Sequence, residues 1–196
     1  MHQTERQEKL DRQTAELYQA VGEFTVNFEH VTYTMQQGVI SLMQLSGLKS
    51  YQVGEILLAE LTAHPLKSML QALLAELLVL STDDRKICDN LFARTQKLIE
   101  QRNNIIHSTW FVGWAHADDT EFSDALGQKL SRGKTGAKAK TFTYKAEEFR
   151  LHSAECKKVS TLLFRLNACA LRGRSISKNF VTSKTGVVSE STQPES

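Results

Sequence analysis

The sequence predicts an all-α fold: an up-and-down bundle of four to five helices with a β-hairpin inserted between the last two long helices. Three observations support this prediction. Apolar residues recur at steps of three, four or seven through most of the 196 residues, which is the spacing of one helix face. Only two prolines and ten glycines interrupt them, and these residues most disfavour helix interiors. Between about residues 108 and 145 the pattern changes to an alternation typical of strands.

The first helix is expected to begin at Leu10 and to end near Ser46 and Gly47, because glycine commonly ends a helix. Its length would be about 50 Å at the α-helical rise per residue. We interpret the large residues on its apolar face as core and not as a ligand-binding surface. That face comprises Leu10, Leu17, Val21, Phe24, Phe28, Val31, Met35 and Leu42.

Two shorter helical stretches are expected next, over residues 53–63 and 66–80. They are separated at His64 and Pro65, because proline lacks a backbone N–H and disfavours helix in the residue before it. The second stretch has a wide face of leucines, which is typical of a helix at the centre of a bundle.

After these two shorter stretches, a second long helix is expected from about Thr82 to His107. The hydroxyl of Ser81 can cap its start, and Asp83 and Asp84 follow in the first turn, where carboxylates interact favourably with the helix dipole. Its expected core residues are Ile87, Leu91, Leu98 and Ile105. A last helix is expected over residues 146–172, with Gly173 after it.

The segment between these two helices is the expected hairpin insert, about residues 108–145. Residues 108–115 resemble one strand, and residues 140–144 alternate and are its expected partner. Between them an acidic run gives way to a basic run. The plain interpretation of the basic run is a solvated loop, and the functional one is a clamp for an RNA phosphate backbone. Its candidate substrate-binding residues are Lys129, Arg132, Lys134, Lys138 and Lys140.

The composition bounds the domain organisation and the surroundings of the protein. Residues 1–172 are expected to form a single helical domain, and the Ser- and Thr-rich residues 173–196 a flexible tail. Three cysteines without a paired spacing argue against a zinc knot or a disulfide framework and for a reducing compartment. The polar amino terminus is unlike a signal peptide, and the longest apolar stretch is too short to span a bilayer. We therefore expect a cytoplasmic protein without a membrane partner.

One short motif at the end of the helix expected from Thr82 to His107 combines residues suited to phosphate chemistry. Asn103 and His107 are four residues apart and would share a helix face. Arg102 and His107 are separated by roughly 140° around the axis. They could meet only if the arginine reaches around the helix or across to a second copy. A permanently charged guanidinium beside an imidazole supplies charge and proton transfer for a phosphodiester.

Arg102, Asn103 and His107 resemble the signature of the HEPN family, the all-α domains of many prokaryotic ribonuclease toxins and defence proteins. That signature is an arginine, an adjacent polar residue and a histidine four to six residues after the arginine, near a helix end. The resemblance covers the order of helices from about residue 10 to 172, although its specific part is six residues long. It implies an HEPN-like bundle that acts as a homodimer, with the motifs of both chains in one composite site.

The expected reaction is attack of an RNA 2′-hydroxyl on its own phosphate, which leaves a cyclic phosphate. His107 would act as general base or acid, Arg102 would stabilise charge on the non-bridging oxygens, and Asn103 would orient the imidazole or bind the phosphate. No cofactor or metal is expected, because the nucleophile belongs to the substrate. The protein would be a toxin or phage-defence effector, with RNA as substrate and an inhibitor or antitoxin as a further partner.

Other interpretations stay open at this point. A non-catalytic HEPN module could use the same residues to bind nucleotide or RNA, or simply to dimerise. The motif could also be structural, with Arg102 in an interface ion pair and His107 stabilised by the helix dipole, in a bundle that serves as a scaffold. His116 with Asp118 and Asp119 is a weaker candidate for a metal site.

Overall fold

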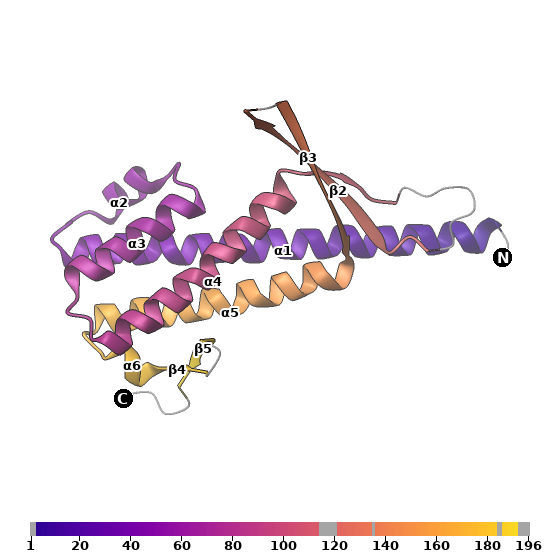
Figure 1. Cartoon of the computed structure of the whole chain (residues 1–196). Helices are drawn as coiled ribbons and strands as arrows, with labels where there is room; N and C mark the ends of the chain where they lie inside the picture. Colours follow the sequence, from indigo (N-terminus) through magenta and orange to yellow (C-terminus); the bar gives the residue numbers. More distant parts are fainter. Residues whose placement is uncertain (1–2, 114–120, 135, 184–185, 192–196) are drawn as a thin grey trace. The chain divides into compact units, whose positions relative to one another are not determined.

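The computed structural model describes residues 3–113, 121–134, 136–183 and 186–191. Within them the chain forms four helices, three strands, two helices and two strands, in that order (Figure 1). Packing divides the chain into two compact units. The sheet unit comprises Met1–Phe28 and Glu100–Glu155, and the helical unit comprises Glu29–Ile99 and Cys156–Ser196.

The expected all-α class is wrong. Of the described residues 68% are helical, but the described residues also form one three-stranded and one two-stranded antiparallel sheet. The larger sheet contains β1 (Thr109–Phe111), β2 (Asp124–Gly133) and β3 (Gly136–Lys145), and the smaller one β4 (Phe180–Thr182) and β5 (Val188–Glu190). The sequence pattern missed β2 because its apolar residues do not alternate, and it missed the smaller sheet because each strand spans only three residues.

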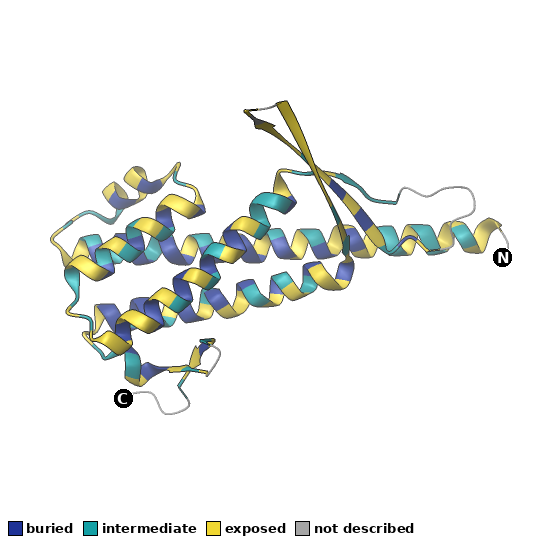
Figure 2. Cartoon of the chain, in the orientation of Figure 1, coloured by how far each residue is buried: buried dark blue, intermediate teal, exposed yellow. Residues whose placement is uncertain are grey.

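Helix α1 (Gln3–Leu45) begins before the expected Leu10 and spans 43 residues. Its apolar face is confirmed as core over most of its length (Figure 2). The residues on this face that are at most 1% exposed include Leu17, Phe24, Phe28, Val31, Met35 and Leu42. After the helix, Gly47 takes a φ of 110°, a conformation that glycine adopts without steric cost.

Helices α2 (Tyr51–Leu58) and α3 (Ala63–Leu77) replace the two shorter stretches expected from the sequence. Pro65 does not break a helix here, because it is the third residue of α3. The first N–H groups of a helix have no partner within it, so a proline in the first turn costs little. Among the described residues, no helix is both long and apolar enough to cross a membrane.

Helix α4 (Thr82–Ile106) begins with the expected Ser81 cap. The Ser81 Oγ accepts a hydrogen bond from the Asp84 backbone N–H at 3.1 Å, and Asp84 Oδ2 accepts from the Ser81 N–H at 3.1 Å and from its hydroxyl at 2.7 Å. This reciprocal arrangement is a capping box. The expected core residues of α4 are all buried: Ile87, Leu91, Leu98 and Ile105.

Helix α5 (Ala146–Leu171) is followed by a short helix, α6 (Ile176–Asn179), and by β4 and β5. Three polar contacts tie the described part of this segment into the helical unit. The Ser177 N–H donates to Asp84 at 2.7 Å, Arg94 donates to the Val188 carbonyl at 2.6 Å, and Arg165 pairs with Glu190 at 3.1 Å. These partners lie far away in the sequence, so local composition does not reveal them.

Candidate functional site

The register of the larger sheet decides which side chains near the motif share a surface. Its strand order is β1-β2-β3, and Trp110, Gly127 and Phe142 lie opposite one another across the three strands. Side chains alternate between the two faces of a sheet, and paired residues share a face. We call one face the lysine–aromatic face. It carries Trp110, Gly127, Lys129, Lys138, Lys140, Phe142 and Tyr144.

The register divides the basic run that the sequence assigns to one loop. Lys129 and Lys140 are cross-strand partners on the lysine–aromatic face, and Lys138 lies on the same face. Arg132 pairs with Ala137 and therefore lies on the opposite face, while Lys134 is in the turn between the strands. The expected pairing of residues 108–115 with residues 140–144 is also wrong, because β2 lies between β1 and β3.

The base of the lysine–aromatic face packs onto α5 through aromatic rings. Phe149 lies 5.4 Å from Trp110 and 5.2 Å from Tyr144 between ring centroids, and His152 lies 5.9 Å from Tyr144. Burial lowers the pKa of His152, although the nearby Glu148 carboxylate acts in the opposite direction. His152 is therefore a second histidine in a specific environment, which its isolated position in the sequence gave no reason to select.

The end of α4 brings Arg102 and His107 into contact within one chain. Arg102 Nη1 lies 3.4 Å from His107 Nε2. The helix ends at Ile106, so His107 lies just beyond it and not on the same regular face as Asn103. The half-buried Arg102 also places its guanidinium carbon 5.8 Å from the centroid of the Phe28 ring, a cation–π distance. The arginine is thus held between an aromatic ring and an exposed imidazole.

Three side chains satisfy carbonyl groups in the last turn of α4. The Lys129 ammonium donates to the Asn103 carbonyl at 3.0 Å, the Ser108 hydroxyl donates to the Asn104 carbonyl, and the Trp110 indole donates to the Ile105 carbonyl at 2.6 Å. The last carbonyls of a helix have no partner within it, and a cation there also interacts favourably with the helix dipole. The sheet therefore positions the helix end that carries the motif.

The candidate substrate-binding lysines differ in their surroundings. Lys129 is half-buried, and besides the Asn103 carbonyl it donates to Asn104 Oδ1 at 3.3 Å. Lys138 and Lys140 are exposed, and Lys140 Nζ lies 4.8 Å from the centroid of the Phe142 ring. Lys129 thus acts on the helix end, whereas the other two present positive charge to solvent beside an aromatic ring.

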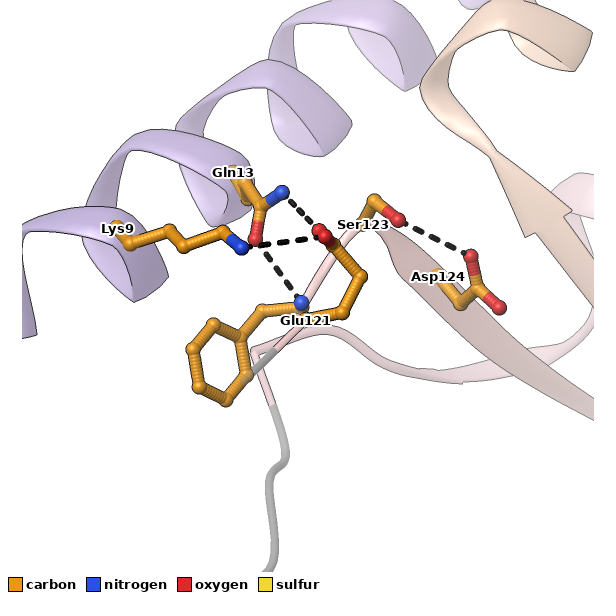
Figure 3. Close-up of polar contacts among 6 residues, drawn as sticks. Lys9, Gln13, Glu121, Ser123 and Asp124 are labelled. Carbon is orange, nitrogen blue, oxygen red and sulfur yellow. Dashed lines mark hydrogen bonds and ion pairs between the residues drawn. The ribbon is translucent and has the colours of Figure 1, made fainter. Parts of the chain in front are cut away.

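Glu121 and Phe122, just before β2, are anchored to α1 (Figure 3). Glu121 accepts hydrogen bonds from Gln13 and from Lys9, the latter at 3.2 Å, and the Phe122 N–H donates to Gln13 at 2.9 Å. The hydrogen bonds from Gln13 and Lys9 lower the pKa of Glu121. The metal-site candidates His116, Asp118 and Asp119 lie outside the described residues. Within the described ranges, no group of three or more His, Cys, Asp or Glu side chains is arranged to hold a metal ion.

The cysteines are buried in the core. Cys88, Cys156 and Cys169 are not joined in a disulfide within the described residues, and each is at most 5% exposed. Burial raises the pKa of Cys88 to about 12, and the carboxylates of Asp84 and Asp89 act in the same direction. Because the thiolate is the reactive form of cysteine, this environment disfavours reaction at Cys88.

Comparison with protein families, curated proteins and solved structures finds no match to this chain. A function for the chain must therefore be inferred from the chemistry of Arg102, His107 and the lysine–aromatic face.

Proposed function

We propose that this chain is a metal-independent endoribonuclease that cleaves RNA by attack of a 2′-hydroxyl on the adjacent phosphate. The contact of 3.4 Å between Arg102 Nη1 and His107 Nε2 is the observation that carries the proposal. It supports the proposal, because a fixed positive charge and a proton-transfer group this close together could both contact one phosphate. The proposed cellular role is that of a toxin or phage-defence effector, restrained by an inhibitor or antitoxin.

In this mechanism the exposed His107 takes the proton from the 2′-hydroxyl or gives one to the departing 5′-oxygen. Arg102 stabilises the negative charge that grows on the non-bridging oxygens, which suits a guanidinium held in place by Phe28 and His107. Asn103, in the last turn of α4, would orient the imidazole or bind the phosphate. The products are a 2′,3′-cyclic phosphate and a free 5′-hydroxyl.

The lysine–aromatic face supports a path for the RNA strand toward this site. Lys138 and Lys140 would contact phosphates, and the half-exposed Phe142 beside them offers a ring on which a base can stack. Lys129 connects this face to the motif, because it pairs with Lys140 across the sheet and donates to the Asn103 carbonyl. Arg132 and Lys134 lie off this face and are secondary candidates.

The test is cleavage of a labelled single-stranded RNA by the purified chain in the presence of EDTA. His107→Ala should lose cleavage at least about 100-fold, the lower range for a general acid or base, with helix content unchanged. His64→Ala, which changes another exposed histidine, is the matched control. A 2′-deoxy substitution at the cleaved position should block the reaction. Undiminished cleavage by His107→Ala would remove the histidine from the mechanism.

The alternative is a non-catalytic module that binds RNA or nucleotide with the same residues. It is favoured by the position of Arg102, which is held in place as a phosphate-binding cation would be, whether or not a reaction follows. The same experiment separates the two functions. If the chain is a binding module, the wild type should bind RNA in a way that depends on Arg102, and it should yield no cyclic phosphate product.

We propose that the enzyme acts as a homodimer. A separate experiment tests whether the two chains build one composite site or each carries a complete site. In a composite site, mixing Arg102→Ala with His107→Ala subunits restores activity when the intact residues come together. If each chain carries its own complete site, the mixture remains inactive. Cleavage per dimer in the mixture, compared with each variant alone, decides between the two arrangements.

A further inference from the structure

Strand β3 forms one edge of the larger sheet. It pairs with β2 over all ten of its residues, and in the described part of the chain no strand lies along its other side. Residues 136–141 are exposed, and the strand contains no proline. A long, exposed edge presents backbone N–H and C=O groups to which another strand can bind.

The sequence of β3 is complementary to itself in antiparallel pairing. Consider two copies of β3 that pair antiparallel about a two-fold axis through Thr141. Lys140 then faces Phe142 of the second copy, and Lys138 faces Tyr144 of that copy. Each lysine on the lysine–aromatic face is then opposite an aromatic ring, a cation–π pairing. On the other face Thr141 meets Thr141, and Ala139 meets Thr143. Threonine pairs of this kind also stabilise antiparallel sheets.

We propose that a second copy of this chain docks along the outer edge of β3, antiparallel and centred on Thr141. Other registers fit less well. An axis at Lys140 places two lysines directly opposite each other, and an axis at Ala139 pairs Lys138 with Lys140, both of which are like-charge pairs. An axis at Phe142 leaves Lys138 beyond the paired residues. Only the Thr141 register pairs both lysines with aromatic side chains.

This pairing creates a continuous six-stranded sheet, with the lysine–aromatic faces of both copies on the same side. Thr109, Gln128 and Thr141 lie in one row across the sheet. Five strand spacings therefore separate Thr109 in the two copies, or about 24 Å. Because His107 is two residues from Thr109, the two motifs would form separate sites and not one composite site. The inference does not rest on the proposed function, since only backbone edges and side-chain complementarity are used.

Cysteine cross-linking tests the register directly. In Thr141→Cys the new thiols face each other across the axis, at the Cα separation of about 4.5–5.5 Å of an antiparallel pair, which suits a disulfide. Thr143→Cys is the matched control, because its symmetry mate is offset by four residues, or roughly 14 Å. The three native cysteines are buried and do not compete. Mild oxidation of the full chain should convert Thr141→Cys into a covalent dimer of twice 22.1 kDa and leave Thr143→Cys monomeric on a non-reducing gel.

Sedimentation of the unlinked protein provides the second measurement. Lys138→Glu with Lys140→Glu should weaken dimerisation at least about tenfold, because four cation–π pairs are lost. Arg132→Glu with Lys134→Glu makes the same change of charge off the lysine–aromatic face and should leave the dimer unchanged. Equal cross-linking at positions 141 and 143, or unchanged dimerisation of the Lys138 and Lys140 variant, would overturn the proposal.

Discussion

The indole N–H of Trp110 donates a hydrogen bond to the carbonyl of Ile105 at 2.6 Å. Trp110 belongs to the first strand of the larger sheet, and Ile105 belongs to the last turn of the helix that carries the motif. His107 lies between these two anchored residues. The position of the imidazole relative to Arg102 therefore depends on the packing of the sheet as well as on the helix.

Replacing Trp110 with phenylalanine removes this donor and keeps an aromatic ring. We expect Trp110→Phe to lower the free energy of unfolding by about 1–2 kcal/mol, because the Ile105 carbonyl loses its partner in a half-buried position. Urea denaturation monitored by circular dichroism measures the change. Tyr33→Phe, at a position that is 60% exposed, should stay within about 0.5 kcal/mol of the wild type.

Gly127 has a steric role beneath the same indole. A Cβ at this position would lie 2.8 Å from the Trp110 ring, closer than a carbon contact allows. Gly127→Ala should therefore destabilise the protein by about 1–3 kcal/mol, since the ring must move. In a Trp110→Leu background the same substitution should cost much less, because the clashing ring is gone. A double-mutant cycle of unfolding free energies measures this coupling, and additive costs would contradict the proposed clash.

From the lowered pKa of Asp84 we predict how the free energy of unfolding depends on pH. Burial acts to raise its pKa, but hydrogen bonds from Ser81 and Ser177 outweigh burial, and the pKa is lowered. A lowered folded-state pKa stabilises the protein above the unfolded value of about 3.9, and this stability is lost as the pH falls through the folded value. We expect Asp84→Asn to cost about 1–2 kcal/mol at pH 7, as for loss of a helix cap.

The difference between wild type and Asp84→Asn should shrink below about pH 4. Urea midpoints at neutral and acidic pH measure it. Asp83→Asn is the control, because Asp83 is an exposed neighbour in the same helical turn, and its smaller effect reflects the helix dipole alone. A constant difference between wild type and Asp84→Asn across this pH range would show that the Asp84 charge is not the stabilising feature.

The two faces of the sheet predict different salt dependences of RNA binding. Lys138→Gln with Lys140→Gln would remove two of the proposed phosphate contacts, so the slope of log affinity against log salt concentration should become shallower by about 1.4. Arg132→Gln with Lys134→Gln removes the same charge away from the lysine–aromatic face and should change the slope less. Fluorescence anisotropy with a single-stranded RNA at several salt concentrations measures both. Equal changes in the two variants would indicate a diffuse electrostatic effect.

The sequence alone determined the long helices, because their signals are local. The period of the apolar residues identified the cores of α1 and α4, and the hydroxyl of Ser81 identified the start of α4. The same local reading singled out Arg102 and His107 as a pair. It required the arginine to reach around the helix or across to a second copy, whereas the helix ends at Ile106 and the two side chains are in contact within one chain.

Only the tertiary structure decided which side chains share a surface. Lys129 and Arg132 are close in the sequence, but the register of β2 places them on opposite faces. The contact of Trp110 with Gly127 and the contacts that fix the segment after residue 172 join residues distant in the chain. Strand pairing and such long-range hydrogen bonds depend on partners that a local pattern does not specify, since a shift of one residue moves every side chain to the other face.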